Sequence, residues 1–152
     1  MSDTLDRILA LSALHEEETS PLDRTKLSAM LAEAFHHATL GDGSLGYLIA
    51  FDQDADYDSV NFRWFQSGFD RFVYVDRIVV AASQRGKGVA RSFYADLFDA
   101  ARKAGHSRIV AEININPPNP GSMDFHAKMG FVELDKVTLS PGKTVSYQEY
   151  RL

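Results

Sequence analysis

A glycine-rich turn, Ser83-Gln84-Arg85-Gly86-Lys87-Gly88, contains the residues whose types and spacing point most directly to chemistry. Gly86 and Gly88 carry no Cβ, so a phosphate group can approach the backbone there and the chain can adopt positive φ angles. An amphipathic helix is predicted directly after the turn, and its first amides have no helical partners, which favours an anion. Positive charge is supplied by Arg85, Lys87 and Arg91. The turn therefore predicts a pyrophosphate-binding cradle; the alternative is a strand-to-helix turn that needs glycine only for its shape.

The spacing of the turn excludes two common phosphate-binding motifs. A P-loop carries Ser or Thr after its Gly-Lys pair, whereas Gly88 follows Lys87, and a dinucleotide fingerprint carries a third glycine where this chain has Arg91. The run Arg85-Gly86-Lys87-Gly88-Val89-Ala90 does match the pattern Q/R-x-x-G-x-G/A. On these residues the sequence resembles the GNAT superfamily of acyl-CoA-dependent N-acyltransferases, in which this loop binds the pyrophosphate of CoA.

The elements that position this turn are predicted from apolar periodicity and from glycine and proline punctuation. The predicted strands are residues 8–14, 36–40, 45–51, 72–80, 108–115, 131–134 and 144–147, and the predicted helices are a segment after Ser20-Pro21 that runs to about residue 37, then 58–68, 89–104 and 121–129. The Gly41-Asp42-Gly43 turn supplies the positive φ angles that a hairpin needs. Segment 58–68 is predicted as a short helix or an ordered loop.

Composition limits the class of protein. The chain has 152 residues and 45% hydrophobic content, which predicts one domain, residues 1–152, with a sizeable core. It has no cysteine, which suits a reducing cytoplasm, and its apolar runs are too short to span a membrane. Its net charge is -5 without a basic block beyond the turn, so nucleic acid is not an expected partner. We expect a cytoplasmic protein that binds neither nucleic acid nor a membrane.

A second motif strengthens the resemblance. Residues 119–131, Asn119-Pro120-Gly121-Ser122-Met123-Asp124-Phe125-His126-Ala127-Lys128-Met129-Gly130-Phe131, are similar to the family pattern Asn-x-x-Ala/Ser-x-x-aliphatic/aromatic-Tyr-x-x-x-Gly-Phe. The order of predicted elements is similar to the GNAT core over essentially the whole chain. Within the superfamily, the stretch from Tyr57 to Phe65 resembles an uncharacterised bacterial branch of predicted acetyltransferases. The resemblance implies an α/β fold with a mixed, mostly antiparallel, splayed sheet of about seven strands flanked by helices.

The resemblance also implies acetyl-CoA as the cofactor and a set of residues that bind it. These residues are Ile78, Val79, Val80, Arg85, Gly86, Lys87, Gly88, Val89, Ala90, Arg91, Asn119, Ser122 and His126. In the family, exposed amides near residues 78–80 bind the pantetheine arm and the thioester oxygen. Asn119 either touches the pantetheine or caps the following helix.

The catalytic residues implied by the resemblance are His126, Asp76 and Glu112. Many relatives carry a tyrosine as general acid at the position of His126, and an imidazole can donate a proton near neutral pH more readily than a phenol. The alternative is a structural histidine. Asp76 and Glu112 interrupt apolar strands, where burial could raise the pKa of either carboxyl so that it accepts an ammonium proton. The alternatives are an ion pair or exposure on an outward face.

The aromatic segment suggests an acceptor pocket formed by Tyr57, Asn61 and Trp64; the alternative is that these residues only cover the sheet. No metal site is predicted, because adjacent strand residues such as His36 and His37 face opposite sides. We expect an acetyl-CoA-dependent N-acetyltransferase that acts by direct attack of an amine, from a small molecule or a peptide, in a ternary complex. The alternative is a non-catalytic module that binds or senses acyl-CoA, and a homodimer is a family habit.

Overall fold

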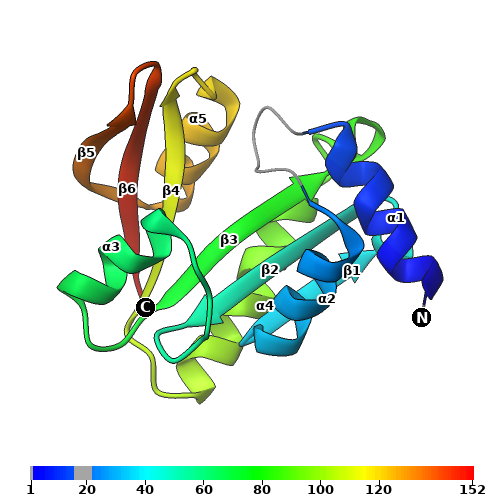
Figure 1. Ribbon diagram of the computed structural model, residues 1–152, viewed down its shortest axis with the longest axis horizontal. Helices are drawn as coiled ribbons and strands as arrows, with labels where there is room; N and C mark the ends of the chain where they lie inside the picture. The colour runs from blue at the N-terminus through cyan, green and yellow to red at the C-terminus, as the bar shows by residue number, and fades with distance from the viewer. Residues whose placement is uncertain (1, 16–21) are drawn as a thin grey trace.

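The computed structural model describes residues 2–15 and 22–152 of the chain. Six strands form one sheet in the order β1-β2-β3-β4-β6-β5, in which only the β3–β4 pair is parallel (Figure 1). The predicted mixed, mostly antiparallel α/β fold is therefore confirmed, with six strands rather than about seven. The elements are α1 (Ser2–Ala13), α2 (Arg24–Glu33), β1 (His36–Leu40), η1 (Gly41–Gly43), β2 (Gly46–Asp52), α3 (Val60–Gly68), β3 (Val73–Val80), η2 (Ala82–Gln84), α4 (Val89–Lys103), β4 (Arg108–Asn116), α5 (Pro120–Met129), β5 (Val132–Ser140) and β6 (Lys143–Arg151).

The strand predicted at residues 8–14 is wrong, because this segment belongs to helix α1. Ile8 and Leu11 lie three positions apart and are both buried in the core. In so short an apolar run, one buried helical stripe and a buried strand give the same pattern. A hydrogen bond of 2.6 Å between the hydroxyls of Ser12 and Tyr47 also links the helix to the sheet.

Helix α2 is shorter than predicted. The predicted turn at Ser20-Pro21 lies outside the described residues, and the helix begins after Asp23, whose carboxylate accepts a hydrogen bond of 2.7 Å from the amide of Lys26. The helix ends at Glu33 rather than near residue 37, because the chain turns to extended backbone at Ala34 and then pairs with β2. Tertiary pairing thus overrides the helical propensity at its C-terminal end.

The other predicted elements are confirmed. The β1–β2 hairpin turns through Gly41-Asp42-Gly43, whose φ angles are 60°, 52° and 96°. Segment 58–68 is helical in α3, where the hydroxyl of Ser59 accepts a hydrogen bond from the amide of Phe62. The last hairpin is longer than predicted, since β5 and β6 are each nine residues long.

The sheet separates two apolar clusters. One face is covered by α1, α2 and α3, and their buried residues Ile8, Leu27 and Phe62 belong to one cluster (Figure 1). The other face is covered by α4 and α5, where Phe93 and Leu97 are buried in the second cluster. Because successive strand residues point to opposite faces, each central strand contributes side chains to both clusters.

Strands β3 and β4 diverge after a short contact. They pair only at Val73 with Ile109 and at Tyr74 with Val110. Beyond these pairs β3 remains bonded to β2 up to Val80, and β4 remains bonded to β6 through residue 116. The β2–β3 register shifts between the partners of Val75 and Arg77, which makes Asp76 the extra residue of a β-bulge. The predicted splay of the sheet is therefore present, and each diverging strand is supported on its far side.

Candidate functional site

A cavity of about 900 Å³ lies where β3 and β4 diverge. Residues 75–80 of β3 and 111–114 of β4 line its two long sides. Its remaining walls come from α4, α5, the segment before α3, the β5–β6 hairpin, Lys26 of α2 and His15. Within the described residues, no other element fills the space between the diverging strands, and this space forms a concave site large enough to hold a ligand.

The glycine-rich turn lies at one end of this cavity, where Arg85 and Ala90 contribute to the wall. Gly86 and Gly88 have φ angles of 75° and 76°, and a Cβ added at either position would meet no atom within 4 Å. The backbone amides of residues 86–91 donate no hydrogen bond within the described residues. The turn and the first turn of α4 therefore present a group of unpaired amides, as an anion-binding site requires.

The inner edge of β3 is also unpaired. Past Tyr74, this edge has no strand partner, and Ile78, Val79 and Val80 line the cavity. Opposite them, Asn119 caps α5 by accepting a hydrogen bond of 3.3 Å from the amide of Ser122, so the capping alternative is present. Both Asn119 and Ser122 line the cavity as well. Eight of the predicted cofactor residues thus line the cavity, namely Ile78, Val79, Val80, Arg85, Ala90, Asn119, Ser122 and His126. The other five, Gly86, Lys87, Gly88, Val89 and Arg91, belong to the turn and the start of α4 next to Arg85 and Ala90 and do not line it.

His126 is buried and both of its ring nitrogens are engaged. Its Nδ1 lies 2.8 Å from the carbonyl oxygen of Ser122, which can only accept, so Nδ1 carries the proton. Burial lowers the pKa of His126, partly offset by that carbonyl, so the ring is neutral and Nε2 accepts a hydrogen bond of 2.7 Å from the hydroxyl of Tyr94. This tautomer cannot take a proton from the Ser122 hydroxyl, 3.2 Å from Nδ1. Ser122 is therefore not activated as a nucleophile.

Glu112 is part of a three-residue chain of hydrogen bonds. The hydroxyl of Tyr147 donates to Asn61 Oδ1 at 2.8 Å, and Asn61 Nδ2 donates to Glu112 Oε1 at 3.1 Å. The other oxygen, Oε2, is buried and accepts no hydrogen bond of good geometry from the described residues, although the buried hydroxyl of Tyr74 lies near enough to lower the pKa of Glu112. Burial, followed by the charge of Asp76, raises the pKa of Glu112 to about 8. Burial and the Glu112 carboxylate in turn raise the pKa of Tyr147 to about 12.

Asp76 is fully paired. Its Oδ2 accepts a hydrogen bond of 2.7 Å from Arg77 Nε, and its Oδ1 accepts one from the hydroxyl of Tyr57. The side chains of Asp76 and Arg77 are only 6% and 2% exposed. A carboxylate that is ion-paired on one oxygen and hydrogen-bonded on the other is poorly placed to accept a further proton. Glu112 differs in that only one of its oxygens, Oε1, accepts a hydrogen bond of good geometry.

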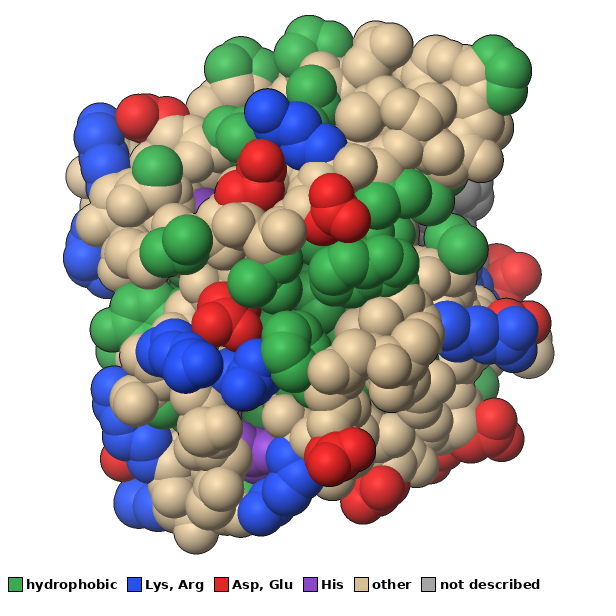
Figure 2. All heavy atoms as spheres, turned by 90° about the vertical axis from the view of Figure 1, so that its left-hand side faces the viewer, with side chains coloured by type: hydrophobic (Ala, Val, Ile, Leu, Met, Phe, Trp, Pro, Cys, Tyr) green, Lys and Arg blue, Asp and Glu red, His purple; other side chains and the backbone are tan. Residues whose placement is uncertain are grey.

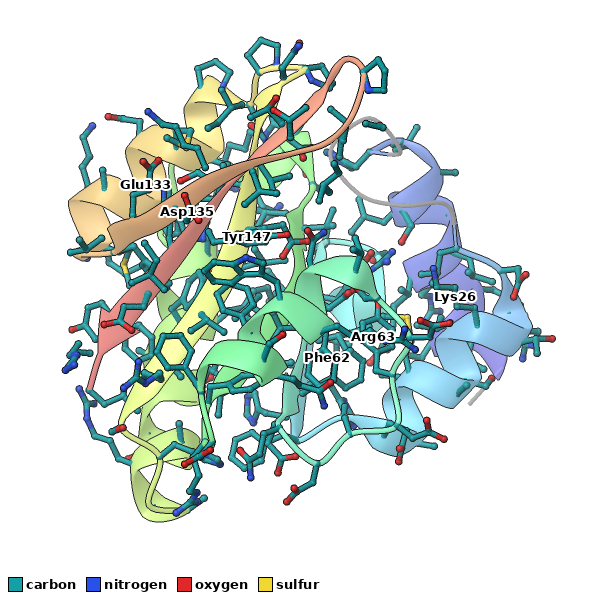
Figure 3. All side chains as sticks on the ribbon, turned by 60° about the vertical axis from the view of Figure 1, so that its left-hand side comes forward. Lys26, Phe62, Arg63, Glu133, Asp135 and Tyr147 are labelled. Carbon is teal, nitrogen blue, oxygen red and sulfur yellow. The ribbon has the colours of Figure 1, made fainter. Side chains whose placement is uncertain are left out.

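The predicted acceptor residues separate into two groups. Tyr57 and Asn61 line the cavity, whereas Trp64 does not. Trp64 stacks on Tyr147 with ring centroids 4.2 Å apart, at the place where α3 lies over β6 (Figure 3). On the face formed by α3 and the β5–β6 hairpin, Figure 2 shows hydrophobic side chains gathered beside acidic ones. Trp64 therefore supports the ring of Tyr147, whose hydroxyl donates to Asn61, and does not contact the cavity itself.

Three residues of the site were not predicted from the sequence. Tyr94 falls in the apolar stripe of α4 and reads as a core residue, and Tyr147 reads as part of a strand. Lys143 follows the hairpin turn, lines the cavity and donates a hydrogen bond of 2.8 Å from Nζ to Asn114 Oδ1. Only their polar tips distinguish the two tyrosines from ordinary core residues, and a sequence does not show where these tips point.

The described residues contain neither a metal-binding cluster nor a membrane-spanning helix. No group of three or more His, Cys, Asp or Glu side chains that could hold a metal ion occurs within residues 2–15 and 22–152. In the same ranges, the helices are all too short or too polar to cross a membrane.

Comparisons with known proteins agree with this geometry. The structure is similar to that of a ribosomal-protein-alanine N-acetyltransferase from Brucella melitensis, with a TM-score of 0.67 and 18% identity over 100% of this chain and 96% of the other. It is also similar to an aminoglycoside 6'-N-acetyltransferase complexed with coenzyme A, with a TM-score of 0.68 and 12% identity over 97% and 89%. A third similar structure is the NatC complex bound to Gag peptide and CoA, with a TM-score of 0.70 and 12% identity over 98% and 91%.

A sequence comparison with curated proteins gave no match. The model of the acetyltransferase (GNAT) family, by contrast, matches residues 8–131, which include the glycine-rich turn, both diverging strands and α5. This protein therefore belongs to the GNAT acetyltransferase family, whose members are acyltransferases that use acetyl-CoA.

Proposed function

We propose that the protein transfers an acetyl group from acetyl-CoA to a primary amine by direct attack in a ternary complex, with Glu112 as the general base. The observation that carries this proposal is the position of Glu112. It borders the cavity between the two diverging strands, and burial raises the pKa of its carboxyl to about 8. A base with a pKa near the working pH is the most effective, because it is both available and strong enough to take a proton.

The residues of the cavity fit the cofactor. Acetyl-CoA, when bound, supplies a thioester as the activated acetyl group. The unpaired amides of residues 86–91 would hold its pyrophosphate, and Arg85 would add positive charge. The unpaired edge of β3 at residues 78–80 offers backbone groups to the pantetheine arm, with Asn119 and Ser122 on the opposite wall. In this proposal, CoA binds along the channel through these backbone and side-chain groups.

Direct attack is favoured over a covalent acyl-enzyme. The sequence has no cysteine, and the tautomer of His126 leaves Ser122 without a base. The amine must then reach the acetyl group itself, and it has to lose a proton to do so. Glu112 takes that proton, while Asn61 holds its carboxylate through Oε1. Asn61 is thus a positioning residue, and Tyr147 fixes the orientation of its amide.

His126 retains its proposed role as a general acid, with a limit set by its surroundings. To donate from Nε2 it must first become an imidazolium, and burial lowers its pKa below 6.5. In that state Tyr94 would accept a hydrogen bond from Nε2 rather than donate one. The assistance of His126 to the departing thiolate is therefore restricted to the acid side of neutrality.

The experiment is the pH dependence of thiol release from acetyl-CoA, with CoA binding measured in parallel. The kcat/KM of the parent should rise about tenfold per pH unit below about pH 8 and then level off. Glu112→Gln should lower kcat by about 10²- to 10⁴-fold without weakening CoA binding. It should also remove the rise of kcat/KM with pH below about pH 8. Asp124→Asn, which removes a carboxylate from the exposed side of α5, is the control. An unchanged rise of kcat/KM with pH in Glu112→Gln would exclude Glu112 as the base.

A further inference from the structure

Lys143 and Glu112 are two ionisable side chains of opposite type that both line the cavity. Lys143 is half-buried in the cavity wall, and its hydrogen-bond partner, the Asn114 side-chain oxygen, is uncharged. No carboxylate of the described residues lies within ion-pair distance of its Nζ. Within residues 2–15 and 22–152, Glu112 likewise has no cationic group within ion-pair distance, and its Oε2 accepts no hydrogen bond of good geometry. A half-buried ammonium group without a counter-ion is a ready anchor for an anionic group.

The spacing of the two charges is set by strand β4. Glu112 and Asn114 are alternate residues of this strand, so their side chains lie on the same face, about 7 Å apart along it. Lys143 Nζ lies 2.8 Å from Asn114 Oδ1, and its charge acts on the pKa of Glu112. A ligand that carries a carboxylate and an amine on the same carbon atom fits such a gap. Each of its two polar groups would make a charge-assisted contact of about 2.8 Å with one of the two side chains.

Three other charged side chains of the cavity wall are ion-paired. Asp76 and Arg77 are paired with each other, and Asp58 is paired with Arg63 at 2.9 Å. Arg85 lines the wall at the glycine-rich turn, and Lys26 lines it from α2. Four aspartates precede α3, at positions 52, 54, 56 and 58, and only Asp58 borders the cavity. This acidic segment therefore does not favour a purely cationic acceptor. Apolar side chains line the same part of the wall, namely Tyr57, Val60 and Leu139.

We propose that the acceptor is an α-amino acid with an apolar side chain, whose carboxylate binds Lys143 and whose amine faces Glu112. This assignment rests on the proposed function and names its substrate class. One carbon carries both groups, which matches the short distance between the two anchors. The apolar side chain contacts the Tyr57, Val60 and Leu139 part of the wall. A peptide N-terminus or a plain amine lacks the carboxylate and leaves Lys143 without a counter-ion.

The test uses three forms of the same amine with the full-length protein. Phenylalanine, phenylalanine amide and phenethylamine, together with the matching leucine series, are compared by thiol release from acetyl-CoA. The free amino acids should have the highest kcat/KM. Lys143→Met should lower kcat/KM for the free amino acids by about 10- to 100-fold more than for the other two forms. The small effect through the pKa of Glu112 is shared by all three forms. Lys136→Met is the matched control, since Lys136 lies on the same hairpin, is 64% exposed and does not line the cavity.

The outcomes separate the two proposals. If the amide and the plain amine are acetylated as well as the amino acid, the amino-acid assignment is overturned while the acetyltransferase function stands. The same holds if Lys143→Met affects all three forms equally, or if it raises only the KM for acetyl-CoA. CoA binding without thiol release for any amino acid also overturns the assignment. Absence of CoA binding by the parent protein overturns the proposed function itself.

Discussion

Two of the titratable groups that border the cavity, Glu112 and His126, are held in opposite protonation states. Burial raises the pKa of Glu112 to about 8 and lowers the pKa of His126, so at neutral pH both side chains are predominantly uncharged. Each is fixed by a neighbour that a sequence pattern does not reveal, Asn61 for the carboxyl and Tyr94 for the imidazole. The Glu112 carboxylate therefore forms as the pH rises toward about 8, and the His126 imidazolium forms as the pH falls toward its lowered pKa.

This arrangement predicts a pH-dependent effect of replacing His126. In His126→Gln, kcat at saturating acetyl-CoA should fall by up to about 10²-fold at the acid end of the range, because the imidazolium is then lost as a proton donor. The ratio of parent to variant kcat should decrease as the pH rises through the lowered pKa and approach one above about pH 8. Steady-state rates from about pH 5.5 to about pH 9 measure this ratio.

A ratio that stays constant across this range would contradict proton donation by His126. Such a result would instead assign His126 to packing between α4 and α5, where its ring lies edge-on to Tyr94 and Phe131. CoA affinity is the control for folding, since the variant should bind CoA as the parent does.

At the scale of the elements, sequence patterns predicted what depends on local chemistry. The glycine-rich turn, the Gly-Asp-Gly hairpin and the short helix at 58–68 each follow from a few adjacent residues, and all are present. The first helix and the end of α2 could not be predicted, because strand pairing and burial across the sheet decide them. The same limit applies to the site: Asn61 and Glu112 are 51 residues apart and meet only through the fold.

The turn that opens α4 gives a prediction at this scale. Gly88→Asp should weaken CoA binding by at least about tenfold, because its side chain brings a negative charge to the unpaired amides. Gly142→Asp is a matched control at the β5–β6 turn. Its φ of 79° is close to the 76° of Gly88, and a Cβ at either position meets no atom within 4 Å.

The two variants should therefore lose a similar free energy of unfolding, about 1–2 kcal/mol each, from the strained backbone. Isothermal titration with CoA and urea unfolding separate the two effects. Equal CoA affinity in both variants would show that the cradle lies elsewhere.

For the whole molecule, the raised pKa of Glu112 links stability to pH. The carboxyl binds its proton more tightly in the folded protein, with a pKa of about 8, than in the unfolded chain, where the ordinary value is 4.5. The contribution of this proton to the free energy of unfolding is fully present below pH 4.5 and is lost as the pH rises through about 8. The upper limit of the loss is on the order of 4 to 5 kcal/mol.

Glu112→Gln should therefore gain stability relative to the parent as the pH rises, because an amide of the same shape does not ionise. Urea unfolding of both proteins at about pH 5 and about pH 8.5 measures the difference. If the gap between the two unfolding free energies is the same at both pH values, the carboxyl has an ordinary pKa in the folded state.

The unpaired amides of residues 86–91 have a consequence for how such a protein can diverge. Main-chain donors are present whatever side chain a residue carries, so this end of the channel tolerates substitution at every position except the two glycines that shape it. The acceptor site that we propose depends instead on side chains, above all those of Lys143 and Glu112, which line the cavity. A lineage can therefore exchange the acceptor through changes in the last hairpin while it inherits the donor site intact.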